Sequence, residues 1–110
     1  MRNSPMVFLA LADLPEESMR TCAIEGREIV VCRTKGGIFA LDNICTHAFA
    51  RLSEGRLRKM RLICPLHGAS FDVRDGRALG SPAIRGLATH HAELTGEQVE
   101  IALNARESVQ

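Results

Sequence analysis

Short apolar segments separated by turn residues run along the whole chain. Residues 7–11 form a plausible first strand, and residues 27–34 are rich in β-branched side chains and fit a strand buried on both faces. Residues 98–103 alternate cleanly between apolar and polar positions, as one face of a sheet requires. Residues 14–18 offer at most one helical turn, and no stretch of twelve residues has the stripe of an amphipathic helix.

Glycine and other turn residues recur at short, regular intervals. Lys35, Gly36 and Gly37 follow the segment 27–34 and turn the chain into residues 38–41, which predicts a hairpin. Short strands between regular turn signals are typical of an all-β sandwich or barrel. The fold class predicted from the residues is therefore all-β and antiparallel.

Length and composition set the outer limits. The chain has 110 residues, which predicts one domain over 1–110, with a core of about 7–103 and a tail at 104–110. A large catalytic domain with its own substrate cavity is excluded. The net charge of +1 gives no general attraction to nucleic acid or anionic membranes. The apolar run 6–12 is too short to span a membrane and has no signal-peptide pattern, so we expect a cytoplasmic protein with reduced thiols.

Two short segments combine cysteine with histidine. Cys45 and His47 belong to the first, Cys64 and His67 to the second, and sixteen residues lie between His47 and Cys64. Two cysteines and two histidines bind either a structural zinc ion or a Rieske [2Fe–2S] cluster. Zinc fingers usually pair like with like in each turn, whereas each turn here mixes the two residue types. The mixed spacing favours the binuclear cluster, with zinc as the alternative.

The pattern C-x-H-x16-C-x-x-H-G resembles the signature of the Rieske-type ferredoxins. The resemblance extends over about residues 7–103 and includes residues 41–43 before the first segment, 71–73 after the second and 80–82 further on. It implies a small antiparallel β-sandwich whose tip, formed by two hairpin loops, holds one [2Fe–2S] cluster. It also implies that Cys45 and Cys64 bind the inner iron and that His47 and His67 bind the outer iron.

Five residues are expected to surround this cluster without binding it. Pro65 would stiffen the second loop, and Gly68 would either allow a close backbone approach or adopt a positive φ. Leu66, together with Phe49, could shield the sulfides from water. By the resemblance, Pro82 lies in a third loop that packs over the cluster.

The remaining cysteines and histidines are interpreted as structural. Cys22 and Cys32 fall in strand-like segments and are expected to be small core residues; a disulfide between them is geometrically possible, but the expected compartment argues against it. His90 and His91 are adjacent on a predicted strand, so their side chains point to opposite faces and cannot both bind one metal ion.

The cluster's potential is expected to be low for a Rieske centre. Two neutral histidine ligands raise the potential above that of a four-cysteine cluster. High-potential members of the family carry an extra cysteine in each loop, but Leu66 and the region of Ala50 provide none. Ala69 and Phe71 also lack the hydroxyl groups that those proteins place near the cluster. We therefore expect a potential near the low end of the Rieske range, at about −150 mV.

The function that the resemblance implies is electron transfer. The chain would carry one electron from an NAD(P)H-dependent flavin reductase to the terminal oxygenase of a bacterial system for aromatic hydrocarbon catabolism. It would act as a monomer, contain no catalytic residue and not be an enzyme by itself. Two alternatives remain: a Cys2His2 structural zinc module, and a small Rieske subunit of another oxidoreductase complex.

Charge is unevenly distributed despite the small total. Residues 45–81 hold seven basic and three acidic residues, which gives this segment a net charge of +4. One hypothesis is that partners with acidic surfaces dock near the cluster. The alternative is that Arg58 and Lys59 form a solvated hairpin turn away from it.

Overall fold

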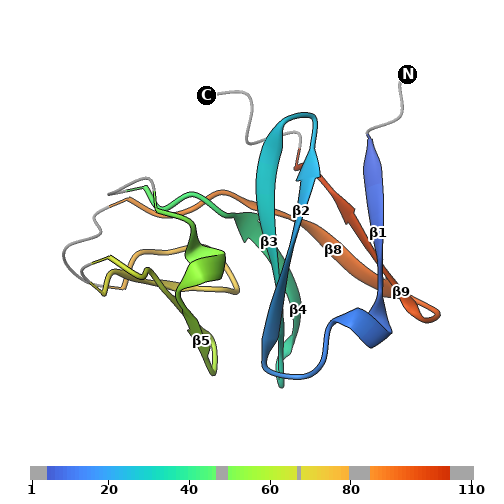
Figure 1. Ribbon diagram of the computed structural model, residues 1–110, viewed down its shortest axis with the longest axis horizontal. Coiled ribbons are helices and arrows are strands. Elements are labelled where there is room, and N and C mark those ends of the chain that lie inside the picture. The colour runs from blue at the N-terminus through green and yellow to red at the C-terminus, as the bar shows by residue number, and fades with distance from the viewer. Residues whose placement is uncertain (1–4, 47–49, 67, 80–84, 105–110) are drawn as a thin grey trace.

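Two antiparallel sheets form the described chain, which comprises residues 5–46, 50–66, 68–79 and 85–104 of a computed structural model (Figure 1). The larger sheet has the strand order β1-β9-β8-β4-β3-β2, and the smaller has the order β5-β6-β7. The strands of the larger sheet are β1 (Met6–Ala10), β2 (Ser18–Ile24), β3 (Arg27–Thr34), β4 (Gly37–Asp42), β8 (Thr89–Thr95) and β9 (Gln98–Ala102). Those of the smaller sheet are β5 (Arg56–Arg58), β6 (Arg61–Ile63) and β7 (Ser70–Asp72). The predicted antiparallel all-β fold is confirmed.

Most of the strands expected from the sequence are present. The strand at 27–34 has the predicted bounds, and it forms the predicted hairpin with β4. The strands expected at 7–11 and 98–103 each lie within one residue of prediction. Residues 14–18, expected to form at most one helical turn, contain no helix; a short 3₁₀ turn, η1 (Leu11–Asp13), precedes them, and a second, η2 (Leu52–Glu54), precedes β5.

The strand β3 separates two hydrophobic cores. Val30 and Cys32 face the core between the two sheets, where they pack with Leu62 and Phe71 of the smaller sheet and with other side chains. Ile29 and Val31 point the opposite way, into a second core within the curled larger sheet. This arrangement explains why the sequence of β3 is apolar on both faces.

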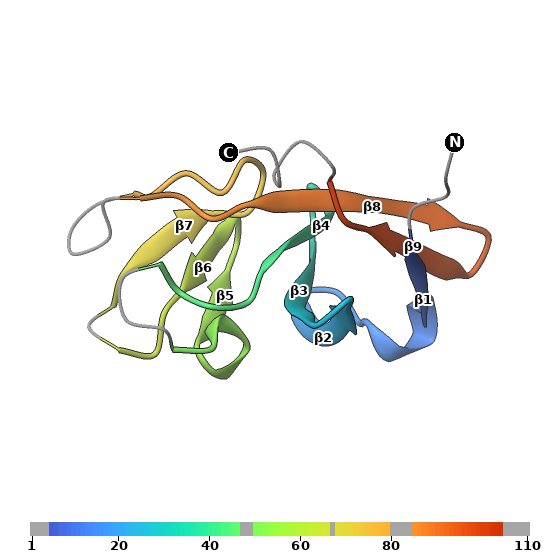
Figure 2. The ribbon, with the colours of Figure 1, turned by 90° about the horizontal axis from the view of Figure 1, so that it is seen from above.

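The smaller sheet is an insertion between two neighbouring strands of the larger one. β4 ends at Asp42 and β8 begins at Thr89, yet the two strands pair, and the Asp42 N–H donates to the Ala88 carbonyl at 3.0 Å. Figure 2 shows the chain passing from the smaller sheet into β8 of the larger one. The inserted segment therefore leaves and re-enters the larger sheet at the same place.

A partly buried hydrogen-bond cluster closes this junction. The His90 ring Nε2 lies 2.8 Å from the Asp42 carboxylate, which also accepts from Arg27 at 3.0 Å. Because His90 Nδ1 accepts from the Asn104 N–H at 3.2 Å, Nε2 carries the proton in the neutral ring. Burial alone would raise the pKa of Asp42, but the hydrogen bonds from His90 and Arg27 hold that pKa below its ordinary value. His91 points the other way and is exposed, as predicted.

A buried carboxylate, that of Asp72, holds the turn after β7. The Asp72 side chain is only 6% exposed and accepts hydrogen bonds from Arg74 at its backbone N, Nε and Nη2, at 2.7–2.9 Å. These bonds, with a weaker contribution from Arg77, lower the pKa of Asp72 to about 2. The ionised Asp72 carboxylate therefore stabilises the folded state fully above pH 3.8, the ordinary pKa of the group. This contribution to the free energy of unfolding is lost as the pH falls toward 2.

We expect Asp72→Asn to lower the free energy of unfolding by about 1–3 kcal/mol at pH 7, because charge-assisted hydrogen bonds are lost in a buried position. Urea denaturation should give the same loss at pH 5, since the wild-type carboxylate remains ionised there. Asp75→Asn, in the same turn but exposed, is the control and should change stability by less than about 0.5 kcal/mol. A loss that shrinks between pH 7 and pH 5 would contradict the assigned pKa.

Candidate metal centre

The first ligand loop is a closed hairpin loop that begins with a cysteine. Ile44 and Arg51 form an isolated antiparallel bridge across its base. Inside the bridge, the Cys45 N–H donates to the Ala50 carbonyl at 2.8 Å. Cys45 is thus fixed at the start of the loop by backbone hydrogen bonds and is fully buried.

The second ligand loop connects β6 to β7 and is built in the same way. Ile63 pairs with Ser70 at its base, and the Cys64 N–H donates to the Ala69 carbonyl at 2.7 Å. In both loops, therefore, a cysteine N–H bonds the carbonyl five residues later. The two-loop tip predicted for the fold is confirmed, and Figure 1 shows both loops at the end of the molecule farthest from β1 and β9.

The two cysteine thiols lie together in the core. Cys45 is 0% exposed and Cys64 is 2% exposed, and a hydrogen bond joins their side chains. Burial raises the pKa of the Cys64 thiol, and its neighbour Cys45 raises it further, while the Leu66 N–H, 3.4 Å from Cys64 Sγ, opposes the rise. The raised pKa favours the protonated form of the Cys64 thiol until a metal ion displaces its proton.

These two cysteines fit the sulfur half of a Rieske cluster. Each loop supplies one sulfur atom, and both sulfur atoms are shielded from water by the shared core, as the inner iron of such a cluster requires. The other predicted ligands, His47 and His67, lie outside the described residues. The structure therefore brings Cys45 and Cys64 together and provides no test of the histidines.

Asn43 anchors the first loop and was not identified from the sequence as a supporting residue. Its side chain is buried: Oδ1 accepts from the Ser53 N–H at 2.8 Å, and Nδ2 donates to Ser53 Oγ at 3.1 Å. Its backbone N–H donates to the Glu28 carbonyl, and its carbonyl accepts from Leu52. In the sequence, Asn43 is marked only by its polar character two positions before Cys45 and by its place in the 41–43 segment that contributes to the resemblance.

A further hydrogen bond ties the first loop to the segment that precedes β8. The Thr46 hydroxyl donates to the Arg85 carbonyl at 2.8 Å. Because residues 85–88 lead back into the larger sheet, this bond joins the first ligand loop to the returning chain. Nothing in the spacing of these residues, 39 apart, could have predicted it.

The predicted neighbours of the cluster have mixed outcomes. Gly68 has φ +73°, as expected, a backbone conformation that favours glycine. Leu66 is 46% exposed, and Pro65 is exposed as well. Phe49 and Pro82 lie outside the described residues.

The other cysteines are separate from this site. Neither Cys22 nor Cys32 is in a disulfide; Cys22 lies opposite Ile29 across the hairpin, so the two thiols are not cross-strand partners. Cys32 is fully buried, and burial raises its pKa to about 12. It is a core residue, as predicted.

Within the described part of the chain, no helix has the length and apolar character needed to cross a membrane.

Comparisons with known proteins agree with this site. Residues 4–91 match the family model described as the Rieske [2Fe–2S] domain. The ferredoxin component of the naphthalene 1,2-dioxygenase system of Pseudomonas aeruginosa is 38% identical over 96 residues, which are 87% of this chain and 92% of that protein. The ferredoxin component of biphenyl 2,3-dioxygenase of Rhodococcus jostii is 42% identical over 80 residues, which are 72% of this chain and 75% of that protein.

Solved structures with a similar fold also include ferredoxins of dioxygenase systems. The ferredoxin of carbazole 1,9a-dioxygenase from Nocardioides aromaticivorans superposes with a TM-score of 0.86 at 27% identity, over 92% of this chain and all of that one. The ferredoxin in a complex of reduced oxygenase and oxidised ferredoxin of carbazole 1,9a-dioxygenase gives 0.84 at 29% identity, over 91% of this chain and 94% of that one. The chain belongs to the Rieske [2Fe–2S] domain family, and its cofactor is a Rieske-type [2Fe–2S] cluster.

Proposed function

We propose that this chain is the ferredoxin component of a multicomponent ring-hydroxylating dioxygenase system. It would receive electrons from an NAD(P)H-dependent flavin reductase and pass them one at a time to a terminal oxygenase, without being an enzyme itself. The observation that carries this proposal is the pair of adjacent buried thiols, Cys45 and Cys64, at the start of two equivalent hairpin loops. The names of the relatives supply the system in which such a carrier works.

The proposed ligands are the four residues of the signature. Cys45 and Cys64 bind one iron, and His47 and His67 bind the other. The burial of the cysteines supports their position at the inner iron. Pro65, Leu66, Gly68 and Pro82 are proposed to surround the site without binding metal.

The protein's part is to hold the site rigid and largely dry. When bound, the cluster supplies reversible one-electron transfer. The loop closures at Ala50 and Ala69 hold the two sulfur atoms at a fixed separation. Such rigidity keeps structural change small when the oxidation state changes.

A low potential is supported by what surrounds the thiols. Ala69 and Phe71 are fully buried beside Cys64 in the same core and bring no hydroxyl group. The Leu66 N–H is one donor to Cys64 Sγ. Because hydrogen bonds to the sulfur atoms raise the potential, the lack of a hydroxyl group at Ala69 and Phe71 supports a potential near the low end, at about −150 mV.

The domain bounds, the location and the oligomeric state complete the proposal. We propose that residues 1–110 act as one Rieske domain with a core of about 7–103 and a tail at 104–110. We place it in the cytoplasm as a monomer that binds its redox partners and not nucleic acid.

The test is spectroscopic. Protein purified under anaerobic conditions should contain two irons per chain, show the visible absorption of a Rieske cluster and have a midpoint potential near −150 mV. It should also restore NADH-dependent turnover when mixed with the reductase and oxygenase of a naphthalene dioxygenase system. A colourless protein containing one zinc ion would support the structural zinc module and end the carrier proposal, and a potential above about +100 mV would exclude the low-potential role.

A further inference from the structure

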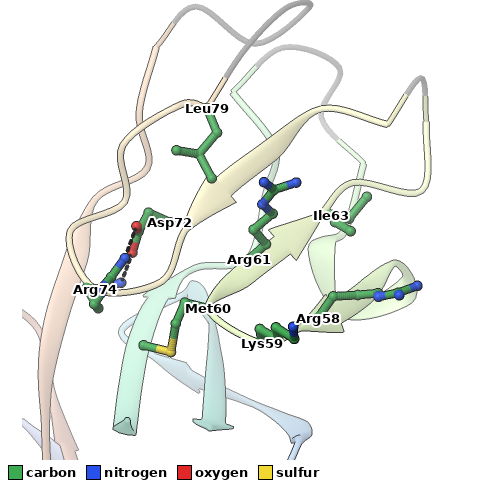
Figure 3. A pocket seen from close by; sticks show the side chains of 8 residues that line it. All are labelled: Arg58, Lys59, Met60, Arg61, Ile63, Asp72, Arg74 and Leu79. Atoms are coloured by element: carbon green, nitrogen blue, oxygen red, sulfur yellow. Dashed lines mark hydrogen bonds and ion pairs between the residues drawn. The ribbon is translucent and has the colours of Figure 1, made fainter. Parts of the chain in front are cut away.

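The three-stranded sheet has an apolar inner face and a basic outer face. Leu57, Leu62 and Phe71 are cross-strand neighbours that pack into the core between the sheets. On the outer face, Arg61 lies directly opposite both Arg58 and the carboxylate-bearing Asp72. Figure 3 looks onto this outer face.

A hollow of about 570 Å³ lies over this face (Figure 3). Its basic lining residues are Arg58, Lys59, Arg61 and Arg74, and Asp72 is the one acidic residue among the described residues of its lining. Four cations against one carboxylate leave three positive charges in excess. The hollow is therefore strongly basic although the chain as a whole is nearly neutral.

Of the four cations of the hollow, only Arg74 forms an ion pair with a described residue. Asp72 already accepts from Arg74 and, more weakly, from Arg77. Arg58, Lys59 and Arg61 form no ion pair with any residue in the described ranges. Like charges directly opposite each other across a strand pair are destabilising, so the arrangement of Arg58 and Arg61 opposes folding.

The hollow leads from the hairpin turn toward the second ligand loop. Lys59 is at the turn between β5 and β6, with φ +57°. At the other end are Ile63, which immediately precedes Cys64, and Leu79. A protein that contacts the second ligand loop can therefore extend along this surface.

We propose that the hollow docks a carboxylate-rich segment of a redox partner protein. This inference rests on the proposed electron-carrier function. Guanidinium groups pair with carboxylates in two-point hydrogen bonds, and the side chains of Met60, Ile63 and Leu79 give an apolar floor for the methylene groups of glutamate. Among the described residues of the lining none is aromatic, so the bases of a single-stranded nucleic acid would find no side chain there to stack on.

The test compares two charge reversals in the full-length protein with its cluster bound. Arg58→Glu lies in the hollow, while Arg20→Glu, on β2 of the larger sheet, is exposed and forms no ion pair with a described residue. Both variants change the net charge by the same amount. The carboxylate introduced by Arg58→Glu would face Arg61, which makes a favourable cross-strand pair, so the variant should fold.

The probe is fluorescently labelled hexaglutamate, with binding followed by anisotropy at 20 mM and 300 mM salt. We expect Arg58→Glu to weaken binding about three- to tenfold at low salt and Arg20→Glu to leave it within about twofold. Binding should be largely lost at 300 mM salt, where the screening length is shorter than the hollow.

The docking proposal would be overturned if Arg58→Glu and Arg20→Glu lost the same affinity for hexaglutamate. It would also be overturned if the wild type did not bind the peptide. Tighter binding of a labelled thymidine dodecamer than of hexaglutamate, lost in Arg58→Glu, would also overturn it in favour of nucleic acid. The visible spectrum and midpoint potential of both variants should match the wild type. If they do and the peptide result fails, the docking surface is wrong and the carrier function stands.

Discussion

Cys64→Ala is expected to yield protein that lacks the visible absorption of the wild type and retains less than about a tenth of its iron. In the proposed ligand set the inner iron binds both thiolates, and an alanine at this buried position offers no replacement ligand. Cys45→Ala should give the same result, because the two thiols are adjacent members of one site. Iron analysis and the absorption spectrum after anaerobic reconstitution measure the effect.

Cys32→Ala is the matched control. Cys32 is as deeply buried and belongs to the same core, but it lies on β3, outside the ligand loops. Removal of one buried heavy atom should lower stability by about 1 kcal/mol and leave the spectrum unchanged. Loss of iron in Cys32→Ala, or a wild-type spectrum in Cys64→Ala, would show that the ligand set is wrong.

Gly76→Ala is expected to lower the free energy of unfolding by about 2–5 kcal/mol. Gly76 has φ +78°, and a Cβ there would lie 2.1 Å from the Leu87 carbonyl oxygen. That carbonyl belongs to backbone that cannot move aside freely, because the Leu87 N–H donates to the Gly76 carbonyl at 2.7 Å. Urea denaturation of the cluster-loaded protein measures the loss.

Gly26→Ala separates the two causes. Gly26 has nearly the same φ, +82°, but a Cβ there would meet no atom within 4 Å. This variant should therefore lose only about 1–2 kcal/mol, the penalty for a left-handed alanine. If Gly76→Ala and Gly26→Ala lowered the free energy of unfolding equally, the close approach of Gly76 to Leu87 would not restrict the backbone.

The larger sheet was predictable where the sequence pattern reflects burial. The strand β3 was predicted correctly because both of its faces pack into hydrophobic cores, and its sequence is therefore apolar on both faces. The bounds of β2 were not predicted because it is an edge strand with only Ile24 fully buried, so its sequence carries little pattern. The strands of the smaller sheet have three residues each, too few for any periodicity to be visible.

The metal centre was predictable only at the level of side-chain chemistry. Cysteine and histidine stand out in any sequence, so Cys45 and Cys64 were identified without a structure. The features that position them are backbone hydrogen bonds to Ala50 and Ala69, and these leave no mark on residue identity. Asn43 acts through contacts with Ser53 that depend on the fold of the whole loop.

The insertion of the smaller sheet between β4 and β8 has a consequence for the order of folding. Closing the larger sheet brings together Asp42 and Ala88, whereas bringing Cys45 to Cys64 closes a chain segment less than half as long. Because the entropy lost on loop closure rises with loop length, contacts of low contact order form first. We therefore expect the two ligand loops to meet while β8 is still unpaired, so that the site for iron is assembled before the sheet that supports it is complete.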